Sequence, residues 1–267
     1  MATRIAVFGA GGKMGRALVR AVSENKGAVL SAAVERPEFP YLSADVSQLA
    51  GLPASGLRLS DQRPGKGSAD VWIDFSAPAA TMANVQAAAA CGAAMVVGTT
   101  GLSPTDKEKI GVATKMIPVV LAPNMSVGVN VMLKLVAEAA RLLGPSYDLE
   151  IVETHHRAKR DAPSGTALRL AEVLAEATGR DLDKTARYER HGDIGPRTDA
   201  EIGIQTLRGG DVVGDHTVFF FGPNDRIEIT HRASSREMFA SGAVRAALWL
   251  AGKPAGLYDM RDVLGLK

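Results

Sequence analysis

Residues 4–22, RIAVFGAGGKMGRALVRAV, place an apolar run, a glycine-rich turn and an amphipathic segment in direct succession. The run Arg4–Phe8 is typical of a buried strand, and residues 16–22 are typical of a helix. Glycine lets a backbone approach a pyrophosphate closely, and the helix N-terminus can meet its charge. The order predicts a dinucleotide-binding unit, although the spacing is closer to G-x-x-G-x-x-G than to the usual pattern.

A second apolar run, Val29–Val34, ends in Glu35, twenty residues after Gly15. An acidic side chain at this point of a dinucleotide fold hydrogen-bonds the adenosine ribose hydroxyls. The neighbouring Arg36 can meet a ribose 2′-phosphate. The pair therefore predicts use of both NADH and NADPH; the alternative is that both residues are solvated loop charges.

Two further loops follow strand-like runs. Residues 94–97 lead into Gly98, Thr99 and Thr100, and residues 119–121 lead into Ala122, Pro123, Asn124 and Met125. Ligands of open parallel sheets bind at the carboxyl ends of the strands. We therefore expect both loops at a nicotinamide site.

The sequence pattern divides the chain into two parts. Before residue 126, short apolar runs alternate with helical patterns, which predicts a parallel sheet with helices on both faces. After a helix over 127–143, a second sheet, antiparallel or mixed, is predicted from strand-like runs at 149–154, 201–207, 213–221 and 226–231. A last helix, with capping-box spacing between Ser234 and Glu237, is expected to pack on the first part.

The predicted fold class is therefore α/β, with a Rossmann-like parallel-sheet cofactor domain over residues 1–126 and residues 235–267 packed back on it. A second α+β domain over 127–234, with a mixed and largely antiparallel sheet, is expected to bind substrate and to carry oligomer contacts. The run Val218–Phe221 offers apolar surface for a partner subunit, although ordinary core packing is the alternative.

The second informative stretch is residues 150–167, EIVETHHRAKRDAPSGTA. The strand before it would deliver His155 and His156, whose side chains should point to opposite sides. Ser164-Gly165-Thr166 comes before an apolar helical stripe that stops at Gly179, so its N–H groups can receive a carboxylate or phosphate. Together with Lys159, the stretch predicts a proton-transfer group and an anion-binding turn on one loop.

Other readings of this stretch remain open. The turn can be only a helix cap, and a histidine at a strand end can be purely structural. A metal hydrolase could use His155, His156, Asp161, His191 or His231, but adjacent strand histidines point apart and no His-x-x-x-His spacing occurs, so no metal is expected. A nicotinamide-sensing module without catalysis is a further alternative.

Composition limits the function classes. With 267 residues and 46% hydrophobic content the chain can bury the cores of two modest domains, and a net charge of +2 does not indicate a nucleic-acid partner. The single cysteine, Cys91, allows no internal disulfide and fits a reducing compartment. The longest apolar stretch, about residues 87–97, is too short for a membrane span, and no secretory signal pattern opens the chain. We expect a cytoplasmic protein without membrane contact.

Several motifs together resemble the 4-hydroxy-tetrahydrodipicolinate reductase family, also called dihydrodipicolinate reductases. They are the 150–167 stretch, the amino-terminal GAGGKMGR, the GTTG and APNMSVGVN loops, and the tail RASSREMFASGAVRAALWL. The resemblance runs essentially from end to end. It implies NADH- or NADPH-dependent reduction of a cyclic imine dicarboxylate to tetrahydrodipicolinate for diaminopimelate and lysine synthesis, by a protein that is usually a homotetramer built through the second sheet.

The resemblance also implies residue roles. His155 matches the acid/base histidine of the family and Lys159 its proton donor. Substrate would be held by His156, Gly165 and Thr166, with Ser164 assisting. Met125 stands where phenylalanine is common in the family. The cofactor would be held by Gly9, Ala10, Gly11, Gly12, Lys13, Met14, Glu35, Arg36, Gly98, Thr99, Thr100, Ala122, Pro123, Asn124 and Met125.

Overall fold

The computed structural model describes residues 1–266, and these form two compact units. The first unit combines residues 1–127 with the chain from Arg236 onward, and the second is Gly128–Ser235. The second unit is therefore inserted into the first along the chain.

The first unit is built on a six-stranded sheet in the order β11-β5-β4-β3-β1-β2, in which every pairing is parallel. The strands are β1 (Thr3–Phe8), β2 (Ala28–Val34), β3 (Val71–Asp74), β4 (Ala94–Val97), β5 (Pro118–Leu121) and β11 (Gly256–Tyr258). The order reverses next to β1, and ligand sites of such sheets lie at that reversal. This Rossmann-like sheet confirms the predicted α/β class.

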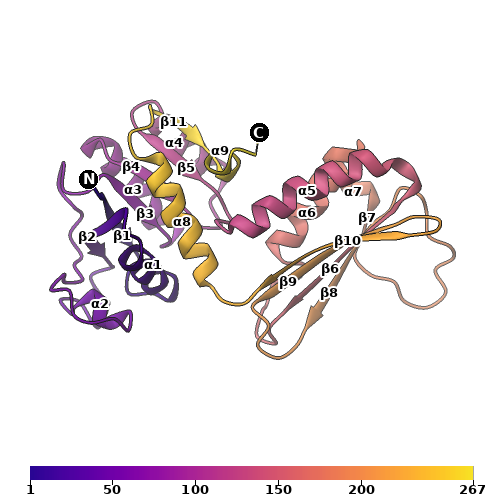
Figure 1. Ribbon diagram of the computed structural model, residues 1–267, viewed down its shortest axis with the longest axis horizontal. Coiled ribbons are helices and arrows are strands. Elements are labelled where there is room, and N and C mark those ends of the chain that lie inside the picture. Colours follow the sequence, from indigo (N-terminus) through magenta and orange to yellow (C-terminus); the bar gives the residue numbers. More distant parts are fainter. Residues whose placement is uncertain (267) are drawn as a thin grey trace. The chain divides into compact units, whose positions relative to one another are not determined.

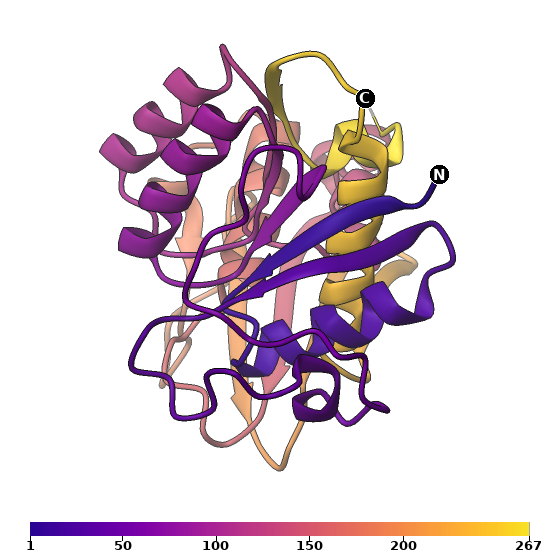
Figure 2. The ribbon, with the colours of Figure 1, turned by 90° about the vertical axis from the view of Figure 1, so that its left-hand side faces the viewer.

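Helices cover both faces of this sheet (Figure 2). On β1, Ile5 and Val7 pack with α1 (Lys13–Glu24) and α8 (Glu237–Leu250), whereas Ala6 and Phe8 face the opposite core. That opposite core contains α3 (Pro78–Cys91) and α4 (Pro104–Ala113). Burial on both faces explains why these strands read as continuous apolar runs. The short helices α2 (Val46–Leu49) and α9 (Met260–Leu264) complete the unit.

The second unit has a mixed sheet in the order β10-β9-β6-β8-β7. Its strands are β6 (Asp148–His155), β7 (Ala186–Arg187), β8 (Ile202–Arg208), β9 (Gly214–Phe221) and β10 (Arg226–Ala233). β6 is parallel to β8 and antiparallel to β9, so it separates two strands that follow each other in the chain. A mixed sheet is confirmed. Most of its pairing is antiparallel, as predicted, because β9 pairs with β10 over its whole length and with β6 over most of it, whereas the second parallel pair, β7–β8, spans only two residues.

Two long helices, α5 (Val127–Leu143) and α6 (Gly165–Thr178), lie along one face of this second sheet (Figure 1). The connections contain the short helices η1 (Gly144–Ser146) and α7 (Leu182–Thr185). Val218 and Phe220 are fully buried under the long helices, whereas Phe219 and Phe221 stack on each other on the opposite face, with ring centroids 5.5 Å apart. The apolar run at 218–221 therefore supplies both core and surface.

One predicted helix start is wrong. The spacing of Ser234 and Glu237 predicted a capping box, but α8 begins at Glu237 with Arg236 as N-cap, and no side chain among residues 1–266 caps it. Glu237 instead accepts a hydrogen bond of 3.1 Å from Arg20 Nε of α1. The Glu237 side chain thus connects α8 to α1.

Candidate active site

The glycine turn after β1 is held against β2. Gly9 has a positive φ of +71°, and the N–H groups of Gly9 and Ala10 both donate to the Val34 carbonyl, at 2.9 and 3.1 Å. A Cβ on Gly15 would overlap the Gly9 carbonyl oxygen, so only glycine allows α1 to approach the turn this closely. The first and last glycines of the turn thus have distinct structural reasons.

The N-terminus of α1 is open to a ligand. Its N-cap, Gly12, contributes no side chain, no other side chain among residues 1–266 caps it, and its first turn has no acidic residue. By contrast, α4 is closed by a Ser103–Asp106 capping box. An uncapped helix start behind a glycine turn fits a phosphate group.

Glu35 lies against the same turn. Its Oε2 accepts the Gly11 N–H at 3.0 Å, and its Oε1 accepts the Arg36 N–H at 3.0 Å. Glu35 is half-buried and Arg36 is exposed. The structure therefore brings together the two cofactor elements that lay 24 residues apart in the sequence.

In the other two predicted cofactor loops, 98–100 and 122–125, several side chains are engaged within the protein. Thr99 is buried and its Oγ1 accepts from Thr81 Oγ1 at 2.8 Å, whereas Thr100 is exposed. Met125 is only 1% exposed and belongs to the core of the first unit. Asn124 Oδ1 accepts the Ser126 N–H at 2.9 Å, which fixes the loop locally.

A buried carboxylate that the sequence did not single out supports the Gly98–Thr100 loop. Asp74, at the end of β3, is fully buried. It accepts hydrogen bonds from the Ser76 N–H at 2.9 Å, from Ser76 Oγ at 2.6 Å and from Asn84 Nδ2 at 2.8 Å. The Gly98 N–H donates to the Asp74 carbonyl at 2.9 Å. The β3 terminus therefore holds the start of this loop.

In the second unit, β6 alternates strictly between buried and half-buried residues. Leu149, Ile151, Glu153 and His155 all point toward the helices, because side chains two apart share a face. The strand register places Glu153 between Thr206 of β8 and His216 of β9, and it places His155 beside Arg208. The buried face thus changes from apolar to polar at the end of the strand.

Glu153 is the centre of this polar end. It is 0% exposed, and its Oε2 lies 2.6 Å from His155 Nδ1. Arg208 donates to both its oxygens, at 2.9 and 3.0 Å. Burial opposes ionisation, but the hydrogen bonds from Arg208, His155 and the Ser164 N–H outweigh it and lower the pKa of Glu153.

The start of α6 is tied to the same carboxylate. The Ser164 N–H donates to Glu153 Oε1 at 3.0 Å, and Ser164 Oγ accepts the Ala167 N–H at 3.1 Å. Ser164 Oγ also lies 2.9 Å from Nε2 of His216, which is buried. Burial, followed by the charge of His155, lowers the pKa of His216 to about 4, so its ring is neutral at neutral pH.

The exposed part of this helix start is Gly165, where an added Cβ would meet no described atom within 4 Å. Thr166 and His156 are half-buried. The hydroxyl and the N–H of Ser164 are both engaged within the protein, so Gly165 is the exposed residue of the turn.

Lys159 lies in the loop between β6 and α6. Its Nζ is 2.7 and 2.9 Å from the two carboxylate oxygens of Asp161, and the hydrogen bond from Lys159 lowers the pKa of Asp161. Its backbone N–H donates to the His156 carbonyl at 3.0 Å. Among the contacts of residues 1–266, none joins the Lys159 side chain to His155. The structure thus groups His155 with Ser164 and pairs Lys159 with Asp161.

Within residues 1–266, no group of three or more His, Cys, Asp or Glu side chains is arranged to hold a metal ion. Over the same residues, no helix has the length and hydrophobicity needed to cross a membrane.

Comparison with known proteins gives two matches that together cover nearly the whole chain. The model of the dihydrodipicolinate reductase N-terminus matches residues 3–125, and that of the dihydrodipicolinate reductase C-terminus matches residues 128–264. The chain belongs to the dihydrodipicolinate reductase family. The boundary between the two matches coincides with the change from the first unit to the second.

Individual members of the dihydrodipicolinate reductase family are similar to this chain along nearly their full length. The chain is 55% identical to a 4-hydroxy-tetrahydrodipicolinate reductase of Anaeromyxobacter dehalogenans (strain 2CP-1 / ATCC BAA-258), covering 99% of this chain and 98% of the relative. It is 52% identical to one of Syntrophotalea carbinolica, covering 99% of both. The structure of a dipicolinate-bound dihydrodipicolinate reductase from Paenisporosarcina sp. TG-14 has the same fold, with a TM-score of 0.73, 23% identity and coverage of 97% and 98%.

These findings confirm the predicted family, the predicted fold class and the predicted reaction class. As a dihydrodipicolinate reductase, the protein is an oxidoreductase of diaminopimelate and lysine synthesis that depends on a nicotinamide dinucleotide.

Proposed function

We propose that this reductase converts 4-hydroxy-tetrahydrodipicolinate to tetrahydrodipicolinate and accepts both NADH and NADPH. The observation that carries the proposal is the second-unit cluster in which His155 and the α6 N-terminus share the Glu153 carboxylate. A proton-transfer group and a carboxylate-binding turn are what the reduction of a dicarboxylate imine requires.

The residues of the first unit fit a dinucleotide. The turn needs glycine at Gly15 for packing, and the α1 N-terminus is left open by Gly12. Glu35 would hold the ribose hydroxyls and Arg36 a 2′-phosphate, which supports acceptance of both cofactors. The full set proposed to hold the cofactor is Gly9 to Met14, Glu35, Arg36, Gly98 to Thr100 and Ala122 to Met125, the last two segments through backbone groups.

The chain's own residues bind the substrate and move its proton. One substrate carboxylate is received by the N–H groups at Gly165 and Thr166, and the other by His156 and the Lys159 ammonium. Ser164 keeps the turn in shape through its contacts with Glu153 and Ala167. A reduced nicotinamide supplies a hydride when it is bound.

Conversion of the 4-hydroxy substrate to tetrahydrodipicolinate consumes one hydride and one proton and releases the hydroxyl group as water. The substrate ring must therefore gain a proton from a group of the protein. We assign this role to His155 Nε2, since Nδ1 of His155 is occupied by Glu153, or to Lys159 Nζ. The proton donor then regains its proton from water. A positioned acid of this kind accelerates such a step by about 10²- to 10⁴-fold.

The direct test supplies the purified protein with the fresh condensation product of pyruvate and aspartate semialdehyde. We expect loss of absorbance of NADH and of NADPH, followed in separate reactions, and no loss when the condensation product is omitted. A preparation that binds nucleotide but oxidises neither cofactor would contradict the proposed reaction and favour a non-catalytic sensing role.

We also propose that the protein is a cytoplasmic homotetramer assembled through the second sheet. Support comes from the face of that sheet opposite α5 and α6, where Phe219 and Phe221 stack and Phe221 keeps 37% of its surface exposed. We expect sedimentation equilibrium to give four times the chain mass of 28.0 kDa. A concentration-independent monomer mass would refute the assembly without affecting the proposed reaction.

A further inference from the structure

Glu153 takes no part in proton transfer above, yet it has more polar contacts than any residue that does. Five hydrogen bonds reach its two oxygens, from His155, Ser164, Thr206 and twice from Arg208. Oε2 contacts the imidazole and Oε1 contacts the first residue of the anion-binding turn. The same carboxylate therefore joins both halves of the candidate substrate site.

We propose that Glu153 is a positioning residue for the reduction: its two oxygens fix the His155 imidazole and the α6 N-terminus in one geometry. The inference rests on the proposed function and deepens it, because it names the group that makes the two site elements act together.

The charge of Glu153 is kept by its surroundings. A fully buried carboxylate is costly unless it is paired and its oxygens are hydrogen-bonded. Arg208 supplies the pairing through both terminal nitrogens, and its Nη2 is anchored on the Asp161 carbonyl at 2.6 Å. Thr206 Oγ1 adds a bond of 3.2 Å. The carboxylate can therefore act only as an acceptor toward His155 and Ser164.

An acceptor at Nδ1 selects the tautomer of His155. The Nδ1 proton points to Glu153, so in the neutral ring the lone pair is on Nε2. A Cβ on Gly214 would lie 2.9 Å from His155 Nε2, so glycine at this position leaves the room that Nε2 occupies. Nε2 is thereby the atom of His155 that can take up and deliver a proton.

The second contact of Glu153, as acceptor of the Ser164 N–H, fixes the conformation of the turn that begins α6. Holding this N–H fixes the residue whose hydroxyl caps Ala167, and His216 holds the same hydroxyl from the β9 side. Gly165 and Thr166 follow directly in the chain, so the direction of their N–H groups depends on the Glu153 contact. Displacement by about 1 Å is enough to cost a catalytic site much of its rate.

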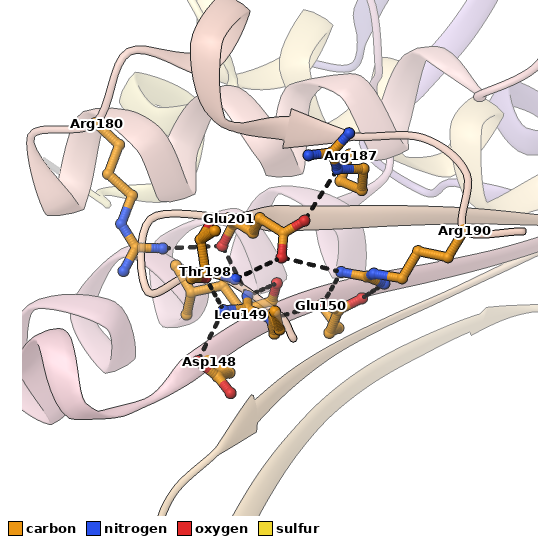
Figure 3. A network of polar contacts seen from close by, with 9 residues as sticks. Asp148, Leu149, Glu150, Arg180, Arg187, Arg190, Thr198 and Glu201 are labelled. Atoms are coloured by element: carbon orange, nitrogen blue, oxygen red, sulfur yellow. Dashed lines mark hydrogen bonds and ion pairs between the residues drawn. The ribbon is translucent and has the colours of Figure 1, made fainter. Parts of the chain in front are cut away.

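A purely structural ion pair is the alternative, and the same unit contains a matched example. Glu201 is 7% exposed and accepts from Arg187 Nε at 2.9 Å and from the Thr198 N–H at 3.1 Å. Figure 3 shows this arginine-rich network around Glu201. Glu201 lies just before β8, at the opposite end of that strand from Arg208, and none of its contacts among residues 1–266 reaches His155.

The experiment compares Glu153→Gln with Glu201→Gln in the full-length protein. Both changes remove one negative charge from a buried, arginine-paired site, so both should lower Tm. We expect only Glu153→Gln to lower kcat, by about 100-fold or more, because loss of the tautomer-setting aspartate of a Ser-His-Asp triad lowers kcat by about 10⁴-fold. We also expect it to raise the Kd of dipicolinate, a non-reducible planar dicarboxylate, about tenfold, while the Kd of NADPH stays unchanged.

A second measurement uses the unmodified protein, so it remains valid if Glu153→Gln does not fold. Nitrogen-15 NMR of histidine-labelled protein, at a pH where the rings are neutral, reports the tautomer of each ring. The signal of His155 is identified by its loss in His155→Gln. We expect the Nδ1–H form.

Two outcomes would overturn the inference: a dominant Nε2–H form of His155 in the unmodified protein, or Glu153→Gln and Glu201→Gln variants with equal kcat and equal Kd for dipicolinate. Failure of the proposed function gives a different result, because the unmodified protein would then oxidise no cofactor while the tautomer and dipicolinate measurements could still succeed.

Discussion

Replacing Lys159 with alanine lowers kcat by about 10²- to 10⁴-fold and leaves the Kd of NADPH unchanged, if the ammonium provides the proton or holds the developing charge. Lys159 belongs to the second unit, whereas the proposed cofactor residues belong to the first. Its Nζ is held by Asp161 at 2.7 Å, so the ammonium is positioned before substrate arrives. Steady-state rates together with fluorescence titration of NADPH separate the two effects.

The matched control is Lys184→Ala. Lys184 forms an ion pair of the same length, 2.7 Å, with Asp181 in the same unit, but it belongs to α7 and its side chain is 81% exposed. Loss of an exposed ion pair has little effect on stability, and kcat should not change. An unchanged kcat in Lys159→Ala would remove Lys159 from the mechanism and leave His155 as the sole proton donor.

Substituting Gly15 with alanine is expected to destabilise the first unit by about 3 kcal/mol and to abolish detectable NADH and NADPH binding. The added methyl group would overlap the Gly9 carbonyl oxygen and approach the Ala10 backbone. Both are main-chain atoms, so no side-chain rotation relieves the overlap. Relief requires α1 to move away from the turn, which displaces the N–H groups that would receive the pyrophosphate.

Gly111→Ala serves as the control for this change. Gly111 lies inside α4, and an added Cβ there would meet no described atom within 4 Å. Alanine is the better helix former, so this variant should gain up to about 1 kcal/mol. Thermal denaturation and nucleotide titration of both variants give the comparison. A Gly15→Ala protein as stable as the unmodified one would show that the α1–turn contact is looser than the structure describes.

Much of the first unit could be predicted because its signals are local. Runs such as Ala94–Val97 are apolar throughout, since both faces of a parallel strand are covered, and their bounds follow directly. The start of α4 is equally local: Ser103 caps the helix and Pro104 fixes φ at its first position, and both effects act within one turn. By contrast, β11 has only the three residues Gly256–Tyr258, too few to give a pattern.

The arrangement of the second sheet could not be predicted in the same way. Turn residues between residues 207 and 213 separate β8 from β9 in the sequence, but they do not reveal that β6 lies between these strands. Strand order depends on which strands pair with one another when the sheet packs under α5 and α6. Such pairing is a long-range property that local sequence patterns do not reveal. The capping-box pattern at Ser234 failed similarly: α8 begins only at Glu237, whose side chain is hydrogen-bonded to Arg20 of another helix.

In the candidate site, too, residues close together in the sequence could be predicted and residues far apart could not. His155, Lys159 and Gly165 could be singled out because 11 residues of one loop contain them all. Their supporting residues could not: Arg208 and His216 come 53 and 61 positions after His155, and only the strand register brings them to Glu153. Glu153 itself could have been noticed, since a residue two positions before a strand-end histidine shares its face.

The insertion of one unit within the other imposes an order on biosynthesis. The core of the first unit includes Ala243, Ala247 and Leu250 of α8, and its sheet is completed by β11 next to β5. A ribosome delivers these segments only after the whole of Gly128–Ser235 has emerged. The nascent chain thus carries an unfinished nucleotide fold, with an unpaired β5 edge, until the segment from Arg236 to β11 has been translated.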